Sequence, residues 1–91
     1  MESFFSLQKR LGKILADTET LRMQSEQAIK EYHELEESFN SADSPDTQVE
    51  ILVKQGELFA RRIKLNHSYI SMTMERRNVE FAINRALSDP F

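Results

Sequence analysis

The sequence predicts an all-α protein, an antiparallel helical hairpin made of two long, coiled-coil-like helices. Three observations support this fold class. Apolar residues recur every three or four positions from Phe4 to Phe39, and a similar pattern follows from about residue 46. The chain has only two Gly and two Pro in 91 residues, too few for the regular turn clusters of an all-β fold. The only clear break lies at residues 40–46.

The first helix is expected over about residues 3–39, with Ser3 or Ser6 as its N-terminal cap. Its apolar positions form an unbroken repeat with an average spacing of about 3.5 residues, which keeps the side chains on one face of a helix. The polar members of this stripe favour close approach of a neighbouring helix. The stripe consists of Phe4, Leu7, Leu11, Ile14, Thr18, Leu21, Ser25, Ala28, Tyr32, Leu35 and Phe39.

A turn at about residues 40–45 separates the helices. The second helix can begin with Ser44 as a cap before Pro45, or with a capping box formed by Thr47 and Glu50. It is expected over about residues 46–88 and to end at Asp89-Pro90. The helix is continuous in this interpretation, and a kink near Asn66–Ser68 is the alternative. So short a connection makes the helices antiparallel, giving a single helical-hairpin domain over residues 1–91.

A turn centred near residue 44 predicts that positions whose numbers add to about 88 face each other. This register places Tyr32 opposite Gly56, where the missing side chain would make room for the ring. It also places Leu21 opposite Asn66. The predicted internal stripe of the second helix is Val49, Leu52, Gly56, Phe59, Ile63, Asn66, Ile70 and Thr73.

The second helix carries another apolar row with a seven-residue repeat. We expect this row to remain exposed and to form an interface, because soluble monomers rarely leave so long an apolar stripe in water. In the alternative, the hairpin rotates or bends and partly buries both stripes. The partner would be a helix of another protein or a second copy of the chain. The predicted partner-binding residues are Ile51, Leu58, Leu65, Tyr69, Met72, Val79 and Ile83.

No catalytic, cofactor-binding, metal-binding or small-molecule site is expected. The chain has no Cys, no Gly-rich phosphate loop and no nucleophile–base pair. His33 lies among acidic residues without a second ligand at a helical spacing, so we interpret it as an exposed side chain rather than a metal ligand. The pairs at 61–62 and 76–77 are basic, but acidic residues surround them and the net charge is −3, which argues against nucleic-acid binding.

Charge is concentrated around the turn, where residues 26–50 contain eight acids and one base. Glu34, Glu36 and Glu37 lie at the C-terminal end of the first helix, where the helix dipole disfavours negative charge. This acidic tip indicates either a docking site for a basic partner or a solubilising surface. No apolar run reaches the roughly 18 residues of a membrane span, and the first residues lack the pattern of a signal peptide, so we expect a cytoplasmic protein.

The turn Ser41–Asp46 between two long helices, followed by an apolar segment at Val79–Leu87, resembles the small two-helix proteins of bacterial type III secretion systems. These include the needle and inner-rod subunits and the co-chaperones that hold needle subunits. Phe4 and Phe5, at the start of the helical stripe, fit the co-chaperones better. The resemblance implies a non-enzymatic chaperone or assembly factor that shields an apolar helix of a partner. The alternative is a structural subunit or a self-associating four-helix bundle.

Overall fold

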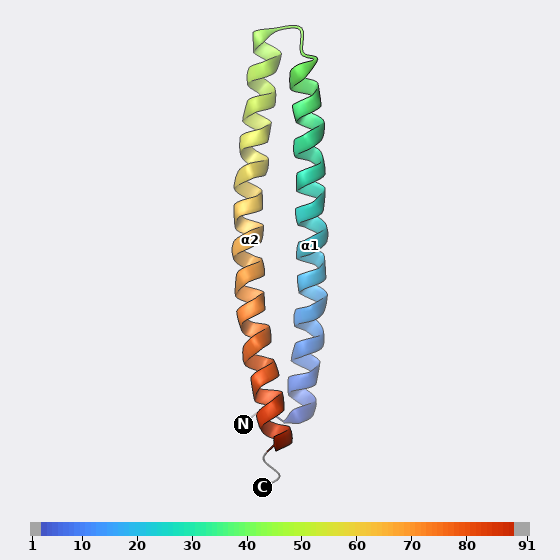
Figure 1. The fold of residues 1–91 in the computed structure, drawn as a ribbon, viewed down its shortest axis with the longest axis vertical. Coiled ribbons are helices and arrows are strands. Elements are labelled where there is room, and N and C mark those ends of the chain that lie inside the picture. Colours follow the sequence, from blue (N-terminus) through green and yellow to red (C-terminus); the bar gives the residue numbers. More distant parts are fainter. Residues whose placement is uncertain (1–2, 89–91) are drawn as a thin grey trace. The chain divides into compact units, whose positions relative to one another are not determined.

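The computed structural model describes residues 3–88 and contains two helices (Figure 1). Helix α1 spans Phe4–Asn40 and helix α2 spans Pro45–Ser88. The fold class is confirmed: two long α-helices pack against each other as a hairpin. The observed bounds differ by at most one residue from those expected, about 3–39 and 46–88. The predicted helix end at Asp89-Pro90 lies outside the described residues.

Both helices begin at a serine cap. The Ser6 backbone N–H donates to Ser3 Oγ at 3.1 Å, and the Thr47 backbone N–H donates to Ser44 Oγ at 3.2 Å. Each bond satisfies a backbone donor that has no partner within the first helical turn. Pro45 is the first residue of α2, a position where its missing N–H costs nothing. Helix α2 therefore starts at the Ser44-Pro45 signal and not at the competing Thr47 capping box.

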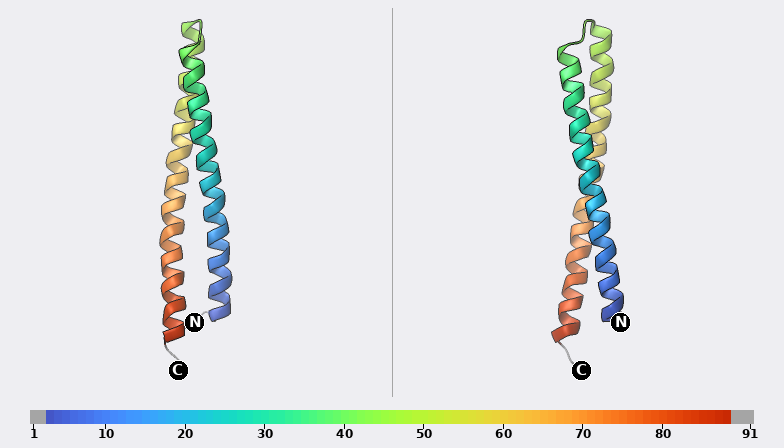
Figure 2. Two further views of the ribbon diagram at one scale, coloured as in Figure 1. Left: turned by 45° about the vertical axis from the view of Figure 1, so that its right-hand side comes forward. Right: turned by 90° about the vertical axis from the view of Figure 1, so that its right-hand side faces the viewer.

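The chain forms two compact units. The turn unit is Arg22–His67, and the end unit combines Met1–Leu21 with Ser68–Phe91. In each unit, a segment of α1 and a segment of α2 run side by side in opposite directions (Figures 1 and 2). Helix α2 is continuous through residues 66–68, where a kink was the predicted alternative. A single domain over residues 1–91 remains a prediction.

The end unit is organised around a small apolar cluster. Leu7 and Ile14 of α1 are buried against Val79 of α2, which is only 2% exposed. Half-buried residues from both helices complete the cluster. They are Leu11, Met72, Ala82 and Ile83.

The turn unit has its own buried residues, Ala28 on α1 and Ile51 and Leu58 on α2. Ala28 is the smallest of these, so the α2 backbone can approach α1 closely there. Around them lie half-buried apolar side chains. These are Ile29, Tyr32, Leu35, Phe39 and Leu65.

The predicted stripe of α1 is confirmed from Leu7 to Phe39, since all its members in this range are buried or half-buried. Phe4, at the start of the helix, is exposed. Thr18 keeps its place on the stripe because its hydroxyl donates to the Ile14 carbonyl oxygen of the same helix at 2.7 Å. A polar residue can therefore occupy the stripe without a partner on α2.

The predicted internal stripe of α2 is wrong. Its five large apolar residues are exposed, with fractions from 43% to 59%. Gly56 and Asn66 are exposed as well, so Asn66 does not face Leu21 in the interior, and only Thr73 is half-buried. The exposed apolar members are Val49, Leu52, Phe59, Ile63 and Ile70.

The row that faces α1 is the one predicted to remain free. Ile51, Leu58 and Val79 are buried, and Leu65 and Met72 are half-buried. The physical reason is continuity. The buried row places an aliphatic side chain at every seventh position, whereas the predicted stripe is interrupted by a glycine, an asparagine and a threonine that would leave the interface poorly filled.

Long polar side chains alternate with the buried aliphatic residues on α2. Gln48, Gln55, Arg62 and Arg76 are all half-buried. Such side chains can lay their methylene groups on apolar neighbours while their polar ends reach water. The Arg76 Nε atom is buried without a hydrogen bond and lies 3.6 Å from Glu80 Oε1, so an ion pair within α2 balances its charge.

The register along the helix axes agrees with the prediction, whereas the rotation of α2 about its own axis does not. The residue numbers of the ion pairs Arg10–Glu75 and Glu31–Arg61 add to 85 and 92, close to the predicted sum of about 88. The position of the turn determines this axial register. It does not determine which face of α2 points inward.

The predicted packing of Tyr32 against Gly56 is also wrong. A Cβ atom added at Gly56 would meet no atom within 4 Å, and the same holds at Gly12. The Tyr32 ring instead lies edge-on to His33, with ring centroids 6.2 Å apart. Neither glycine is required by packing within the hairpin.

Two β-branched residues of α2 in the end unit can test which row of this helix packs against α1. Val79→Ala removes buried methyl groups and should lower the free energy of unfolding by about 2 kcal/mol. Ile70→Ala, on the exposed row, should change it by less than about 0.5 kcal/mol. Urea denaturation followed by circular dichroism measures both. A larger loss of unfolding free energy for Ile70→Ala than for Val79→Ala would contradict this packing and support the internal stripe predicted from the sequence.

Gly12→Ala should stabilise the protein. Gly12 is exposed in α1 and open space surrounds the added methyl group, so the change gains helix propensity without a clash. We expect the free energy of unfolding to rise by about 0.5–1 kcal/mol. Thermal and urea denaturation should agree on the sign, and a loss of stability would show that this face of α1 is covered.

Candidate docking surface on the second helix

The two edges of the helix–helix contact differ in chemistry. In each unit, one edge of the contact carries an ion pair, and we call this edge the ion-paired flank of that unit. In the end unit, Arg10 Nη2 lies 3.7 Å from Glu75 Oε1. In the turn unit, Arg61 Nη1 lies 3.9 Å from Glu31 Oε2. Each of these four residues directly precedes a half-buried position of its helix, as charges at the edge of an antiparallel coiled coil do. Exposed pairs of this kind contribute little stability, but they make this flank polar.

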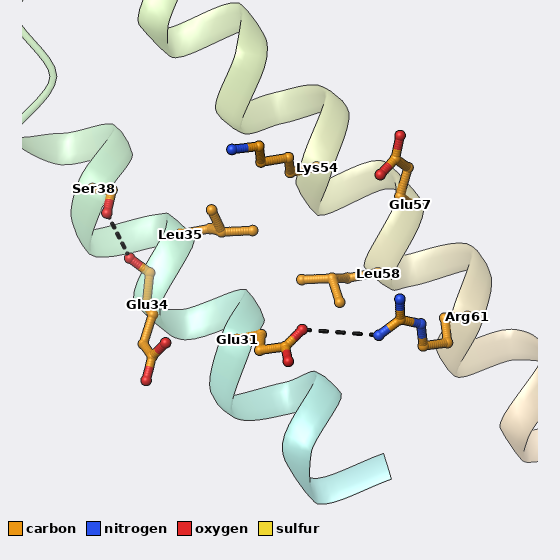
Figure 3. A pocket seen from close by; sticks show the side chains of 8 residues that line it. All are labelled: Glu31, Glu34, Leu35, Ser38, Lys54, Glu57, Leu58 and Arg61. Carbon is orange, nitrogen blue, oxygen red and sulfur yellow. Dashed lines mark hydrogen bonds and ion pairs between the residues drawn. The ribbon is translucent and has the colours of Figure 1, made fainter. Parts of the chain in front are cut away.

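An open depression lies on the ion-paired flank of the turn unit (Figure 3). Leu35 of α1 and Leu58 of α2 point toward one another between the helices, and the Glu31–Arg61 pair spans the gap beside them. The remaining lining residues are polar or charged, with both signs present. They are Glu34, Ser38, Lys54 and Glu57. The mixed charges indicate a solvated groove rather than a site for one charged ligand.

Apolar residues occupy the opposite flank and outer face of α2 in the turn unit. Leu52 and Phe59 each follow a buried position of the repeat, which places them on the edge away from the ion pairs. Half-buried Ile29 has the corresponding position on α1. We call the exposed set on α2 the outward stripe. It consists of Val49, Leu52, Val53, Phe59 and Ile63.

The outward stripe is unusual for a surface helix. Five large apolar side chains within residues 49–63 are each more than 40% exposed. Single exposed apolar residues are common, but a contiguous group marks an interaction surface in a soluble protein. The end unit has its own exposed apolar residues, among them Phe5, Leu15, Ile70, Met74 and Phe81. Exposed apolar surface of this extent suggests a protein partner.

The partner-binding residues predicted from sequence are mostly turned toward α1. Ile51, Leu58 and Val79 are buried, Leu65, Met72 and Ile83 are half-buried, and Tyr69 is exposed. The expectation that this row stays open to solvent is therefore wrong, because it forms the internal contact of the hairpin. A role for these residues in binding another protein remains a prediction.

Sequence reasoning missed the outward stripe, and the charge pattern of the sequence does not single it out. Arg10 with Glu75, and Glu31 with Arg61, are opposite charges at positions whose numbers add to roughly 88. Such charges lie at the edge of an antiparallel contact. Glu26 and Arg62 are also opposite charges, and their numbers add to 88, so the sequence alone does not indicate which pairs border the contact.

The acidic tip shows no assembled ligand set. The His33 Nδ1 atom lies 3.5 Å from Glu36 Oε2, and both side chains are more than half exposed. Within residues 3–88, no three His, Asp or Glu side chains are grouped so that they could hold a metal ion. Neither helix, over the part that the structure describes, has a stretch both long and apolar enough to cross a membrane.

No known protein family, characterised protein or solved structure matches this chain. The resemblance to two-helix type III secretion proteins is therefore supported only at the level of the helical-hairpin architecture.

The acidic tip provides a test of local electrostatics. The last turn of α1 contains no basic residue, although Glu36 and Glu37 are close to its C-terminus. Glu37→Lys should raise the free energy of unfolding by about 0.3–1 kcal/mol at low salt, because a cation stabilises the negative end of the helix dipole. Urea denaturation at about 0.01 M and 1 M salt should show that the gain shrinks with screening. Glu37→Gln should give an intermediate gain, and a loss of stability in either variant would contradict the account.

Proposed function

We propose that this chain is a non-enzymatic binding module that covers an apolar helix of another protein, as a small chaperone or assembly factor. The outward stripe carries this proposal. It presents Val49, Leu52, Phe59 and Ile63 at spacings of three, seven and four residues along one exposed helix face. Anchors at such spacings match those of a second amphipathic helix lying alongside.

The energetics of so small a hairpin favour this role. Among residues 3–88, six hydrophobic side chains are buried, although 40% of the chain is hydrophobic. A protein of this size stabilises itself weakly, so covering exposed apolar surface with a partner would add substantially to the stability of the complex. The same contact would shield the partner's apolar helix from water.

We also propose that the protein acts in the cytoplasm and that its partner belongs to a secretion-type complex. The hairpin architecture supports this part through the resemblance described above. We assign no catalytic residue because the sequence offers no nucleophile–base pair or cofactor cradle.

Paired charges introduced on the outward stripe should abolish partner binding. Leu52→Glu combined with Ile63→Glu replaces two exposed apolar side chains, so the hairpin itself should retain its helical circular dichroism. A tagged double variant should lose the partner proteins that the wild-type chain captures from the native host. Gln8→Glu with Gln24→Glu makes the same change in net charge at exposed polar positions and should keep them.

Undiminished capture by the Leu52/Ile63 variant would refute the assignment of the stripe. Loss of capture by both double variants would also refute it, because charge alone would then explain the effect.

A further inference from the structure

The outward stripe has a symmetric arrangement around Gly56. Leu52 and Val53 precede the glycine by four and three residues, and Phe59 and Ala60 follow it by three and four. Val49 and Ile63 lie seven residues away on either side, on the same face of the helix. Because apolar residues occupy equivalent positions in both directions, a second α2 running the opposite way would present a matching stripe.

Gly56 itself has no role within the hairpin. A glycine inside a helix costs about 1 kcal/mol relative to alanine. Gly56 has no positive backbone φ, and an added Cβ atom would meet nothing within 4 Å. Neither backbone conformation nor packing inside the chain therefore requires it. A glycine does allow the backbone of another element to approach closely, which makes it suitable as a crossing point.

The charges on this part of α2 favour an antiparallel neighbour with the same sequence. Asp46 and Glu50 lie before the centre of the stripe, whereas Lys64 lies after it, and all three side chains are exposed. In an antiparallel pair centred on Gly56, the acidic end of each helix is level with the basic end of the other. A parallel pair would align like charges and like helix dipoles.

We propose that a second copy of this chain docks on the outward stripe, with the two α2 helices antiparallel and a two-fold axis passing close to Gly56. Val49 of one copy then faces Ile63 of the other, and Leu52 and Val53 lie near Phe59 of the partner copy. The interface is isologous, so both copies bury the same residues. The proposal rests on the proposed function, in that it names an occupant of the same protein-binding surface.

Disulfide trapping in the purified chain tests the position of the two-fold axis. The sequence contains no Cys, so any disulfide must form between the introduced cysteines. A two-fold axis at Gly56 brings the two copies of that residue together, and a disulfide requires Cα atoms about 4.4–6.8 Å apart. Gly56→Cys should therefore form a covalent dimer under mild oxidation. Gly12→Cys is the matched control, since Gly12 is also an exposed helical glycine with open space around an added Cβ atom. It should remain largely uncross-linked.

Sedimentation equilibrium provides a second, non-covalent readout. The wild-type chain and Gly12→Leu should be dimers at about 50 µM, whereas Gly56→Leu should raise the dimer dissociation constant at least about tenfold, because the leucine blocks the crossing. Circular dichroism confirms that each variant remains helical. A monomeric wild-type chain, equal cross-linking at residues 12 and 56, or a dimer unaffected by Gly56→Leu would each overturn the proposal.

The result separates this inference from the proposed function. A monomeric chain whose capture of host proteins is abolished by Leu52→Glu with Ile63→Glu overturns self-pairing and leaves the binding module intact. A dimer with the predicted Gly56 dependence, together with host-protein capture insensitive to those two substitutions, supports self-pairing and refutes the chaperone assignment.

Discussion

The contact between the α1 stripe and one face of α2 determines which residues of α2 are buried and which remain available to other proteins. Leu7, Ile14 and Ala28 are buried on α1 at multiples of seven residues, which keeps them in line along the helix. Ile51, Leu58 and Val79 satisfy the same spacing on α2. Once this row of α2 turns inward, the remaining apolar residues of the helix must face outward, and they become the surface available to other proteins.

The two flanks of this contact differ in polarity and therefore in their suitability for binding another protein. Ion pairs such as Glu31–Arg61 occupy one flank, where their small energetic contribution matters less than their polarity. A polar flank discourages unspecific association and leaves the apolar flank as the preferred site of binding. Leu52 and Phe59 on that side extend the internal contact outward, so a docking helix would continue the packing already present between α1 and α2.

The proposed function and self-pairing use the same residues, which links them thermodynamically. A second copy on the outward stripe excludes a partner helix, so each lowers the apparent affinity of the other. Self-pairing would cover Phe59 and Ile63 in the absence of a client, when exposed apolar surface carries a risk of aggregation. Packing within the hairpin does not require Gly56, whereas close approach of a second α2 helix would explain a glycine at this position.

Local sequence determined the two helices, their antiparallel order, the serine caps and the inward face of α1, because each follows from spacing, turn chemistry or chain length. Only tertiary packing decided which face of α2 turns inward. Leu58 and Phe59 are adjacent and point about 100° apart, so rotating α2 by that angle about its axis exchanges a buried row for an exposed one without changing any helix preference. Continuity of the row at Ile51, Leu58 and Val79 against α1 made that choice. The candidate docking surface follows from the same choice, because the apolar residues of α2 outside this row are the ones left exposed.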